Sequence, residues 1–359
     1  MLKQVGLLSL LMTACTSGFY QPLQTQDLSK GNMIASVIEK PLNSHLPLVC
    51  YKQKTLLIQN KGEPLLPQQK NSITPIEYGA FWWSIQKTRF SISSVLRNRS
   101  KQEELLRIMN NVNIKRLYTY AQPFLQSAQA KYLRRWHQNL HQANFESYLL
   151  LGSPVWVCDP REIFRILKIS LNQFQKNSTK QERFDGIYLD IEPHTLTAQD
   201  KRCPYHWDVL KASEKRALMY NLLSIIIKSK QMIHQHTDVY ESSQDQPLKL
   251  AVYLPVWMDN LHTADHIWET AQQRDEYYSC LKRFTNEVTI ASYCRKGLQR
   301  INESLDTEKR LLGRQLRVGF NVYHLQESDA ACKTWRDFDE LRNISKQLHK
   351  LFLPSVNID

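Results

Sequence analysis

The segment 184–194 carries the side chains whose types and spacing are best suited to chemistry. At the two-residue period of a β-strand, one face holds three aliphatic side chains, those of Ile187, Leu189 and Ile191. The opposite face presents a phenol, two carboxylates and an imidazole, from Tyr188, Asp190, Glu192 and His194. Because Pro193 cannot donate to a central ladder, we expect these polar groups near the C-terminal end of the strand.

Asp190 and Glu192 are suited to acid–base work. Two carboxylates on one face repel each other as anions, so one pKa should rise and keep a proton near neutral pH. One alternative is a buried polar network that specifies the fold without turnover. Another is a divalent metal held by Asp190, Glu192 and His194, but these positions spread over about 13 Å of strand, too far for one ion unless Pro193 bends the chain. We therefore expect no metal and no cofactor here.

The elements that must position these side chains alternate along the chain. Strands are expected at 80–85, 114–120, 148–157, 184–194, 249–256, 288–293 and 316–323. Helices are expected at 101–110, 127–141, 161–174, 207–234, 277–284, 298–312 and 337–352. This alternation predicts an α/β fold, a TIM (β/α)8-type barrel, in which catalytic side chains lie at the C-terminal ends of the strands.

The sequence does not settle which residues form the eighth strand of the barrel. Residues 353–359 could form it in abbreviated form, an early segment at 56–58 could complete the ring, or the strand is missing and the barrel incomplete. A doubly wound open sheet is the second interpretation, although no G-x-G-x-x-G motif follows the first strand to support it.

The run Asp185-Gly186-Ile187-Tyr188-Leu189-Asp190-Ile191-Glu192 resembles a known signature. It is similar to the D-G-x-D-x-D-x-E fourth strand of family-18 glycoside hydrolases, the chitinase family, whose fold is a TIM barrel. Asp185, Gly186, Asp190 and Glu192 match, whereas Tyr188 stands where that family has its middle aspartate. The chain from about residue 80 onward also resembles uncharacterised bacterial barrel proteins with an L-D-I-E-P-H type fourth strand.

The resemblance implies roles for individual residues. Glu192 would donate a proton to the glycosidic oxygen, and Asp190 would orient the substrate's own acetamido group as that group attacks the anomeric carbon. Tyr188 removes one carboxylate from this set, which puts the activity or its pH range in question. Tyr293 matches the tyrosine of the family's sixth strand, which touches the acetamido group. Asn321, on the seventh predicted strand, counts against a two-carboxylate retaining mechanism because an amide cannot attack, unless Asp259 or Glu327 reaches the site from a loop.

Further substrate contacts are expected around the mouth of the barrel. The candidates are Tyr188, His194, Trp82, Trp257 and Asp259. Aromatic rings stack well on sugars, but barrel cores also take up aromatics, and both roles stay open. Asp159 and Asp259 each follow a predicted strand, and a loop-capping role is the alternative for each.

The first residues resemble a bacterial lipoprotein signal. A charged Lys3 and a short apolar run lead to Met12-Thr13-Ala14-Cys15, similar to a lipobox, in which signal peptidase cuts before the cysteine and the cysteine is lipidated. We therefore expect a signal peptide at 1–15, a tether and extension at 16–74, and the barrel at 75–359. Thr16, rather than aspartate, after the cysteine implies an outer-membrane location facing the periplasm.

The composition limits the kinds of partner that the protein is expected to bind. The 359 residues carry a formal charge of +13, which favours anionic neighbours, yet the basic residues are scattered and form no nucleic-acid motif. Six further cysteines permit one to three disulfides in an oxidising envelope, with pairing and oligomeric state left open.

These observations predict a membrane-anchored, glycoside-hydrolase-like protein acting on an envelope or environmental glycan that could carry N-acetyl groups. The alternative is a catalytically degenerate, glycan-binding lipoprotein.

Overall fold

A parallel sheet of seven strands forms the centre of the computed structural model, which describes residues 45–51, 78–82, 90–126, 128–240, 247–261, 266–292, 298–319, 342–343 and 346–347. The strands are β1 (Tyr78–Trp82), β2 (Ile114–Thr119), β3 (Glu146–Leu151), β4 (Gly186–Leu189), β5 (Lys249–Pro255), β6 (Glu287–Ala291) and β7 (Leu316–Gly319). They pair in chain order, each with the next. Because this order has no reversal point, the doubly wound interpretation is wrong and the predicted TIM-type architecture is confirmed.

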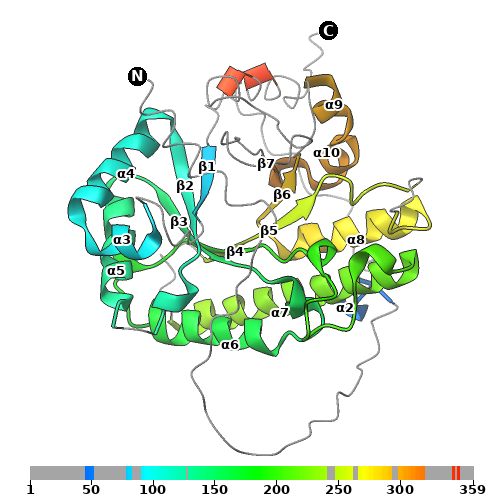
Figure 1. Ribbon diagram of the computed structural model, residues 1–359, viewed down its shortest axis with the longest axis horizontal. Helices are drawn as coiled ribbons and strands as arrows, with labels where there is room; N and C mark the ends of the chain where they lie inside the picture. Colours follow the sequence, from blue (N-terminus) through cyan, green and yellow to red (C-terminus); the bar gives the residue numbers. More distant parts are fainter. Residues whose placement is uncertain are drawn as a thin grey trace, which may run out of the picture.

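Helices cover the outer side of the curved sheet. They are α2 (Leu48–Tyr51), α3 (Ile92–Arg97), α4 (Arg99–Asn111), α5 (Ala130–Gln142), α6 (Arg161–Ile169), α7 (Ala212–Tyr240), α8 (Ala271–Phe284), α9 (Leu298–Glu303) and α10 (Asp306–Leu312). They form an arc from α3–α5 on one flank, through α6 and α7, to α8–α10 on the other (Figure 1). The result is a half-barrel whose edge strands, within the described residues, are β1 and β7.

Most predicted helices match these bounds, with three local differences. The helix expected at 207–234 begins only at Ala212, because Trp207–Val209 forms a separate 3₁₀ turn. The helix expected at 161–174 changes to a π-helical turn at Ser170–Gln175, and the one expected at 298–312 is divided into α9 and α10. The helix at 337–352 falls almost wholly outside the described residues, as do both candidate eighth strands.

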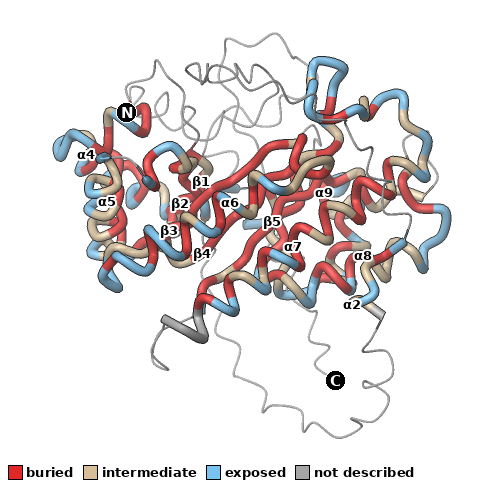
Figure 2. The backbone as a smooth tube through the Cα atoms, turned by 90° about the horizontal axis from the view of Figure 1, so that it is seen from below, coloured by how far each residue is buried: buried red, intermediate tan, exposed pale blue. Residues whose placement is uncertain are grey.

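The apolar core has two layers. The larger layer fills the space between the sheet and its helices, and Figure 2 shows the buried strands lined by the inward faces of α5, α7 and α8. The smaller layer lies on the inner face of the sheet and is aromatic, with Phe81, Tyr118, Tyr148, Tyr188 and Tyr253 as its main members. Gly186 leaves room for this layer, since a Cβ there would lie 2.4 Å from the Tyr148 ring.

Charged side chains fill the N-terminal end of the inner face, below the aromatic layer. Arg116 joins Glu146 at 2.6 Å and Glu287 at 3.0 Å. Lys249 adds a second cation to Glu146 at 2.7 Å, and Arg317 approaches Glu287 at 3.4 Å. Since Glu287 is almost fully buried, this network offsets the cost of holding its charge inside the sheet.

Two disulfides join distant parts of the chain. Cys50 of α2 bonds to Cys280 of α8, and Cys158 after β3 bonds to Cys203 in the long loop after β4. Cys294 and Cys332 lie outside the described residues. No helix in the part that the structure describes is long and apolar enough to cross a bilayer.

Candidate active site

Asp190 lies directly after β4, at the C-terminal end of the strand. Its backbone N–H donates to the Leu151 carbonyl at 2.8 Å, which extends the β3–β4 ladder by one residue. Gly152 faces this step, and a Cβ at Gly152 would lie 2.3 Å from the Asp190 carbonyl oxygen. Only glycine permits so close an approach, so the backbone that carries Asp190 is held against the end of β3.

The predicted facing is confirmed for residues 187–191, whereas the strand predicted to reach 194 ends at Leu189 and a 3₁₀ turn follows at Pro193–Thr195. Ile187, Leu189 and Ile191 pack into the core between the sheet and the helices, and Tyr188 belongs to the inner aromatic layer. Asp190 follows Tyr188 at the two-residue period and is buried. Glu192 is mostly buried but keeps part of its surface exposed, so it can be reached from solvent.

The electrostatics of the two carboxyl groups are unusual. Burial, together with the nearby Glu192 carboxylate, raises the pKa of Asp190 well above its ordinary value. Burial also raises the pKa of Glu192 to about 7. Within the described residues, the Asp190 Oδ1 atom has no hydrogen-bond partner. Two coupled carboxyls with raised pKa values hold a proton near neutral pH, which is the property required of a general acid.

Tyr253 contacts the acid directly, a role that the sequence alone did not predict. Its hydroxyl donates a hydrogen bond to the Glu192 carboxylate, which opposes the effect of burial on the pKa of Glu192. Tyr253 lies near the end of β5, next to β4 in the sheet, and faces inward with Tyr188. The sequence feature that could have predicted this contact is the position of Tyr253 on the inward face of the strand next to β4.

Tyr188, at the position of the family's middle aspartate, packs into the barrel interior. It is fully buried, and its ring lies 4.7 Å from the Tyr118 ring and 5.0 Å from the Phe81 ring, centre to centre. This packing gives Tyr188 a supporting role beneath Asp190. A direct contact with substrate, as predicted, would require the ring to leave the interior.

His194 and Trp257 are brought together beside the acid. Their ring centres are 5.3 Å apart in an edge-to-face arrangement, and Trp207 from the loop after β4 lies 6.0 Å from Trp257. Burial lowers the pKa of His194 to about 4, so the imidazole is neutral at neutral pH. The Lys215 ammonium lies 5.4 Å from the Trp207 ring centre and covers one side of this aromatic cluster.

Trp82 lies on the other face of the sheet. Its indole N–H donates to the Phe90 carbonyl at 2.9 Å, and its ring packs edge-on against Trp136 of α5. The expectation that Trp82 contacts a sugar does not fit this placement, because it belongs to the core between sheet and helices. Its neighbour Phe81 is the β1 residue that faces inward.

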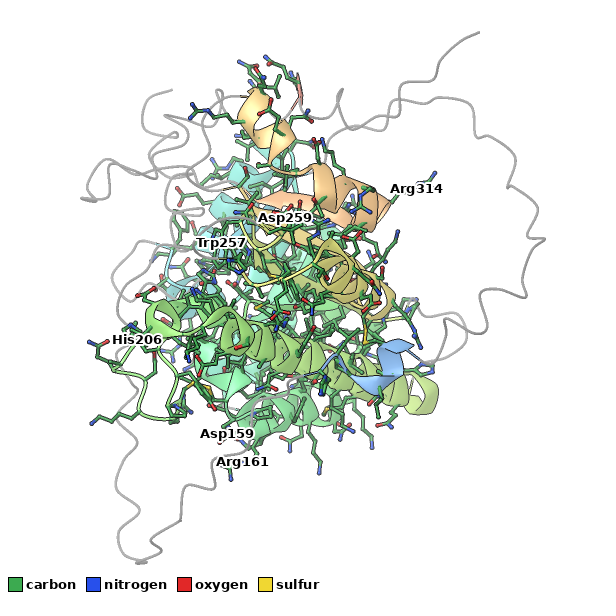
Figure 3. All side chains as sticks on the ribbon, turned by 90° about the vertical axis from the view of Figure 1, so that its right-hand side faces the viewer. Asp159, Arg161, His206, Trp257, Asp259 and Arg314 are labelled. Carbon is green, nitrogen blue, oxygen red and sulfur yellow. A yellow bond between two sulfur atoms is a disulfide. The ribbon has the colours of Figure 1, made fainter. Side chains whose placement is uncertain are left out.

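The two candidate aspartates have different surroundings. Asp159 accepts hydrogen bonds from the Arg161 backbone N–H and guanidinium at the start of α6, which is the predicted capping role. Asp259 lies near the buried Glu308 and raises its pKa, while its backbone carbonyl accepts from Arg274 at 3.4 Å. In Figure 3, Trp257 and Asp259 lie well away from the Asp159–Arg161 pair.

Asp185, the first carboxylate of the signature, has a structural role. Its Oδ2 atom accepts from the Ser147 N–H at 2.7 Å and contacts the His141 Nε2 atom at 2.9 Å. These bonds fix the start of β4 against β3 and α5. They also raise the pKa of His141, chiefly through the hydrogen bond to Asp185.

Tyr293 and Cys15 lie outside the described residues. No group of three or more His, Cys, Asp and Glu in the described part of the chain is arranged to hold a metal ion. The arrangement that is present, a partly exposed acid over a buried carboxyl with an aromatic wall, suits proton donation to a leaving group.

No family model and no curated protein matches the sequence. Searches of solved structures find a chitinase from Chromobacterium violaceum, with 12% identity, 67% of each chain covered and a TM-score of 0.39. A class V chitinase mutant from Cycas revoluta, in complex with (GlcNAc)3, gives 11% identity, coverage of 76% of this chain and 80% of that one, and a TM-score of 0.41. A β-1,4-mannanase from the sea hare Aplysia kurodai has 10% identity, with 61% of this chain and 70% of that one covered and a TM-score of 0.39.

Proposed function

We propose that this chain is a glycoside hydrolase in which Glu192 is the general acid and Asp190 its partner. The observation that carries the proposal is the pair itself: two carboxyls at the C-terminal end of β4, with the pKa of Glu192 raised to about 7. A carboxyl with such a pKa is protonated in a large fraction of molecules at neutral pH and can still donate readily.

The substrate proposed is a glycan with N-acetyl groups. Asp190 is buried, and its Oδ1 atom has no partner among the described residues, so it would accept a bond from an acetamido N–H once substrate binding opens a path to it. A substrate that supplies its own nucleophile needs no second protein carboxylate at the anomeric carbon. His194 and Trp257 are partly exposed and pack on the buried Trp207, so these two rings can offer an edge or a face to a sugar beside Glu192.

A degenerate, glycan-binding barrel is the second candidate. The observation that favours it is Tyr188, since the missing middle aspartate takes one titrating group from beneath Asp190. Partial exposure of Glu192 favours the enzyme, because a blocked mouth would bury that side chain.

We further propose that Cys15 carries lipid and holds the protein at the outer membrane, facing the periplasm. The support is the sequence of residues 1–15 alone. Incorporation of a palmitate analogue into the wild-type chain, and its absence from a Cys15→Ser variant, is the expected result. Labelling of the variant to the same extent would contradict this assignment.

The test of catalysis is reducing-end release from chitooligosaccharides and from peptidoglycan, using the chain without residues 1–15. Loss of a general acid should lower turnover by about two to four orders of magnitude in Glu192→Gln, with binding and thermal stability retained. Glu303→Gln, an exposed glutamate of α9, is the matched control and should keep full turnover.

The outcomes separate the two candidates. Turnover that disappears only in Glu192→Gln supports the enzyme. Binding without turnover in the wild type, unchanged by either substitution, refutes the enzyme and supports the glycan-binding barrel.

A further inference from the structure

An open groove of about 570 Å³ lies on the outer surface, between α4 and α5 near the end of α3. Its lining comes from all three helices and includes Arg97, Arg99, Gln102, Glu103, Tyr132 and Arg135. These helices cover the β1–β3 flank of the sheet, on the side opposite α8–α10 (Figure 1). The groove is therefore separate from Asp190 and Glu192, which follow β4 on the inner side.

The floor of the groove is preorganised. Gln102 is buried, and its amide donates to the Val95 and Leu96 carbonyls at 3.0 and 3.1 Å. Its side-chain oxygen accepts from Asn139 at 2.7 Å, which ties α4 to α5 across the floor. A ligand entering the groove would thus meet fixed polar groups and would not have to order them.

The rim of the groove is cationic. Three arginines face one glutamate, and Glu103 is already paired with Arg99 at 2.9 Å. Arg97 and Arg135 form no ion pair in the described part of the chain, and both are exposed. Arg99, at the start of α4, borders the groove, and the first turn of α4 contains no acidic residue, so the positive end of this helix adds to the field.

The rest of the lining suits a polyhydroxylated chain. Gln138, Asn139 and Gln142 supply amide donors and acceptors for hydroxyl groups, and Tyr132 supplies a ring on which a sugar can stack. Free guanidinium groups at the rim match carboxylate geometry with two parallel hydrogen bonds. Charge and lining together indicate one class of occupant.

We propose that the groove between α4 and α5 binds a carboxylate-bearing glycan segment, held by Arg97 and Arg135. The choice of a glycan rests on the proposed function, whereas the groove itself does not involve the catalytic pair. Such a site would hold an acidic polysaccharide on the outer wall of the barrel while the mouth acts on a chain at the other face.

The experiment measures the affinity of labelled oligogalacturonate for the chain without residues 1–15, by fluorescence anisotropy at fixed low salt. Arg97→Gln/Arg135→Gln should weaken binding by about tenfold for each arginine, because each loses a charge-assisted hydrogen bond. The control is Arg107→Gln/Arg314→Gln, which removes two exposed arginines that do not line the groove.

Loss of affinity in the groove variant alone, with neutral chitooligosaccharide and inorganic polyphosphate bound much more weakly, supports the proposal. Equal loss in the control variant, polyphosphate binding as tight as oligogalacturonate, or no oligogalacturonate binding at all would overturn it. Glu192→Gln should bind oligogalacturonate like the wild type, so failure of the catalytic proposal is seen separately.

Discussion

Glu308 of α10 allows a stability prediction that does not depend on function. Its side chain is fully buried, and its Oε1 atom accepts from the Tyr278 hydroxyl at 3.0 Å. Burial, with the nearby Asp259 carboxylate, raises the pKa of Glu308 to about 8. The folded protein therefore keeps a proton on Glu308 at pH values where the unfolded chain has lost it.

The sign and size of the effect follow from this difference. Between the unfolded pKa of about 4.5 and the folded pKa of about 8, the folded state binds more protons, so the free energy of unfolding falls as pH rises. A pKa moved over that interval corresponds to roughly 5 kcal/mol, an upper figure because water and side chains relax around the charge. Below pH 4.5 this contribution is fully present, and above pH 8 it is lost.

Glu308→Gln should abolish this pH dependence. The amide oxygen can still accept from Tyr278, and the side chain no longer ionises. Urea unfolding followed by tryptophan fluorescence at pH 5, 7 and 9 should show the variant gaining stability relative to the wild type as pH rises, by several kcal/mol at pH 9. Glu303→Gln is the exposed control. A difference between Glu308→Gln and wild type that is the same at all three pH values would refute the reasoning.

Three further predictions follow from the site and the sheet. Tyr253→Phe removes the hydrogen bond that holds down the pKa of Glu192, so the alkaline limb of the activity profile should move up by about one pH unit; a limb that stays or moves down contradicts the assignment. Arg116→Gln leaves Glu287 buried with a weaker partner and should lower the free energy of unfolding by about 3 kcal/mol at pH 7; an unchanged free energy of unfolding would contradict this role of the ion pair. Gly152→Ala forces a Cβ into the carbonyl after β4, so a lower melting temperature and reduced activity are expected, and unchanged values would show that the backbone can move apart.

The strand that carries the acids could be predicted because its pattern is local. The alternation of Ile187, Leu189 and Ile191 with Tyr188 and the acids fixes which face is apolar, and a strand has only two faces. The order of strand and helix along the chain likewise predicted a singly wound parallel sheet, since each βα unit places the next strand beside the last.

What could not be predicted depends on contacts between distant segments. Phe81 and Trp82 are both aromatic, so nothing in β1 shows which one faces inward; the Tyr118 ring of β2 and the Trp136 ring of α5 decide it. Tyr253 meets Glu192 because β5 pairs with β4 in one particular register. The disulfide partners are likewise a property of the folded chain, as with Cys50 and Cys280, which are separated by 230 residues.

The bond between Cys50 and Cys280 also determines how the molecule responds to pulling. Any tension applied to residues before Leu46 passes at Cys50 into α8, next to the hydrogen bond from Arg283 to the Val49 carbonyl. The edge strand β1, which follows Cys50 in the chain, therefore lies off the path of the force, and a covalent bond resists it in place of the β1–β2 ladder. Reduction of this disulfide would transfer the same tension along the chain to β1, where the hydrogen bonds to β2 would have to carry it.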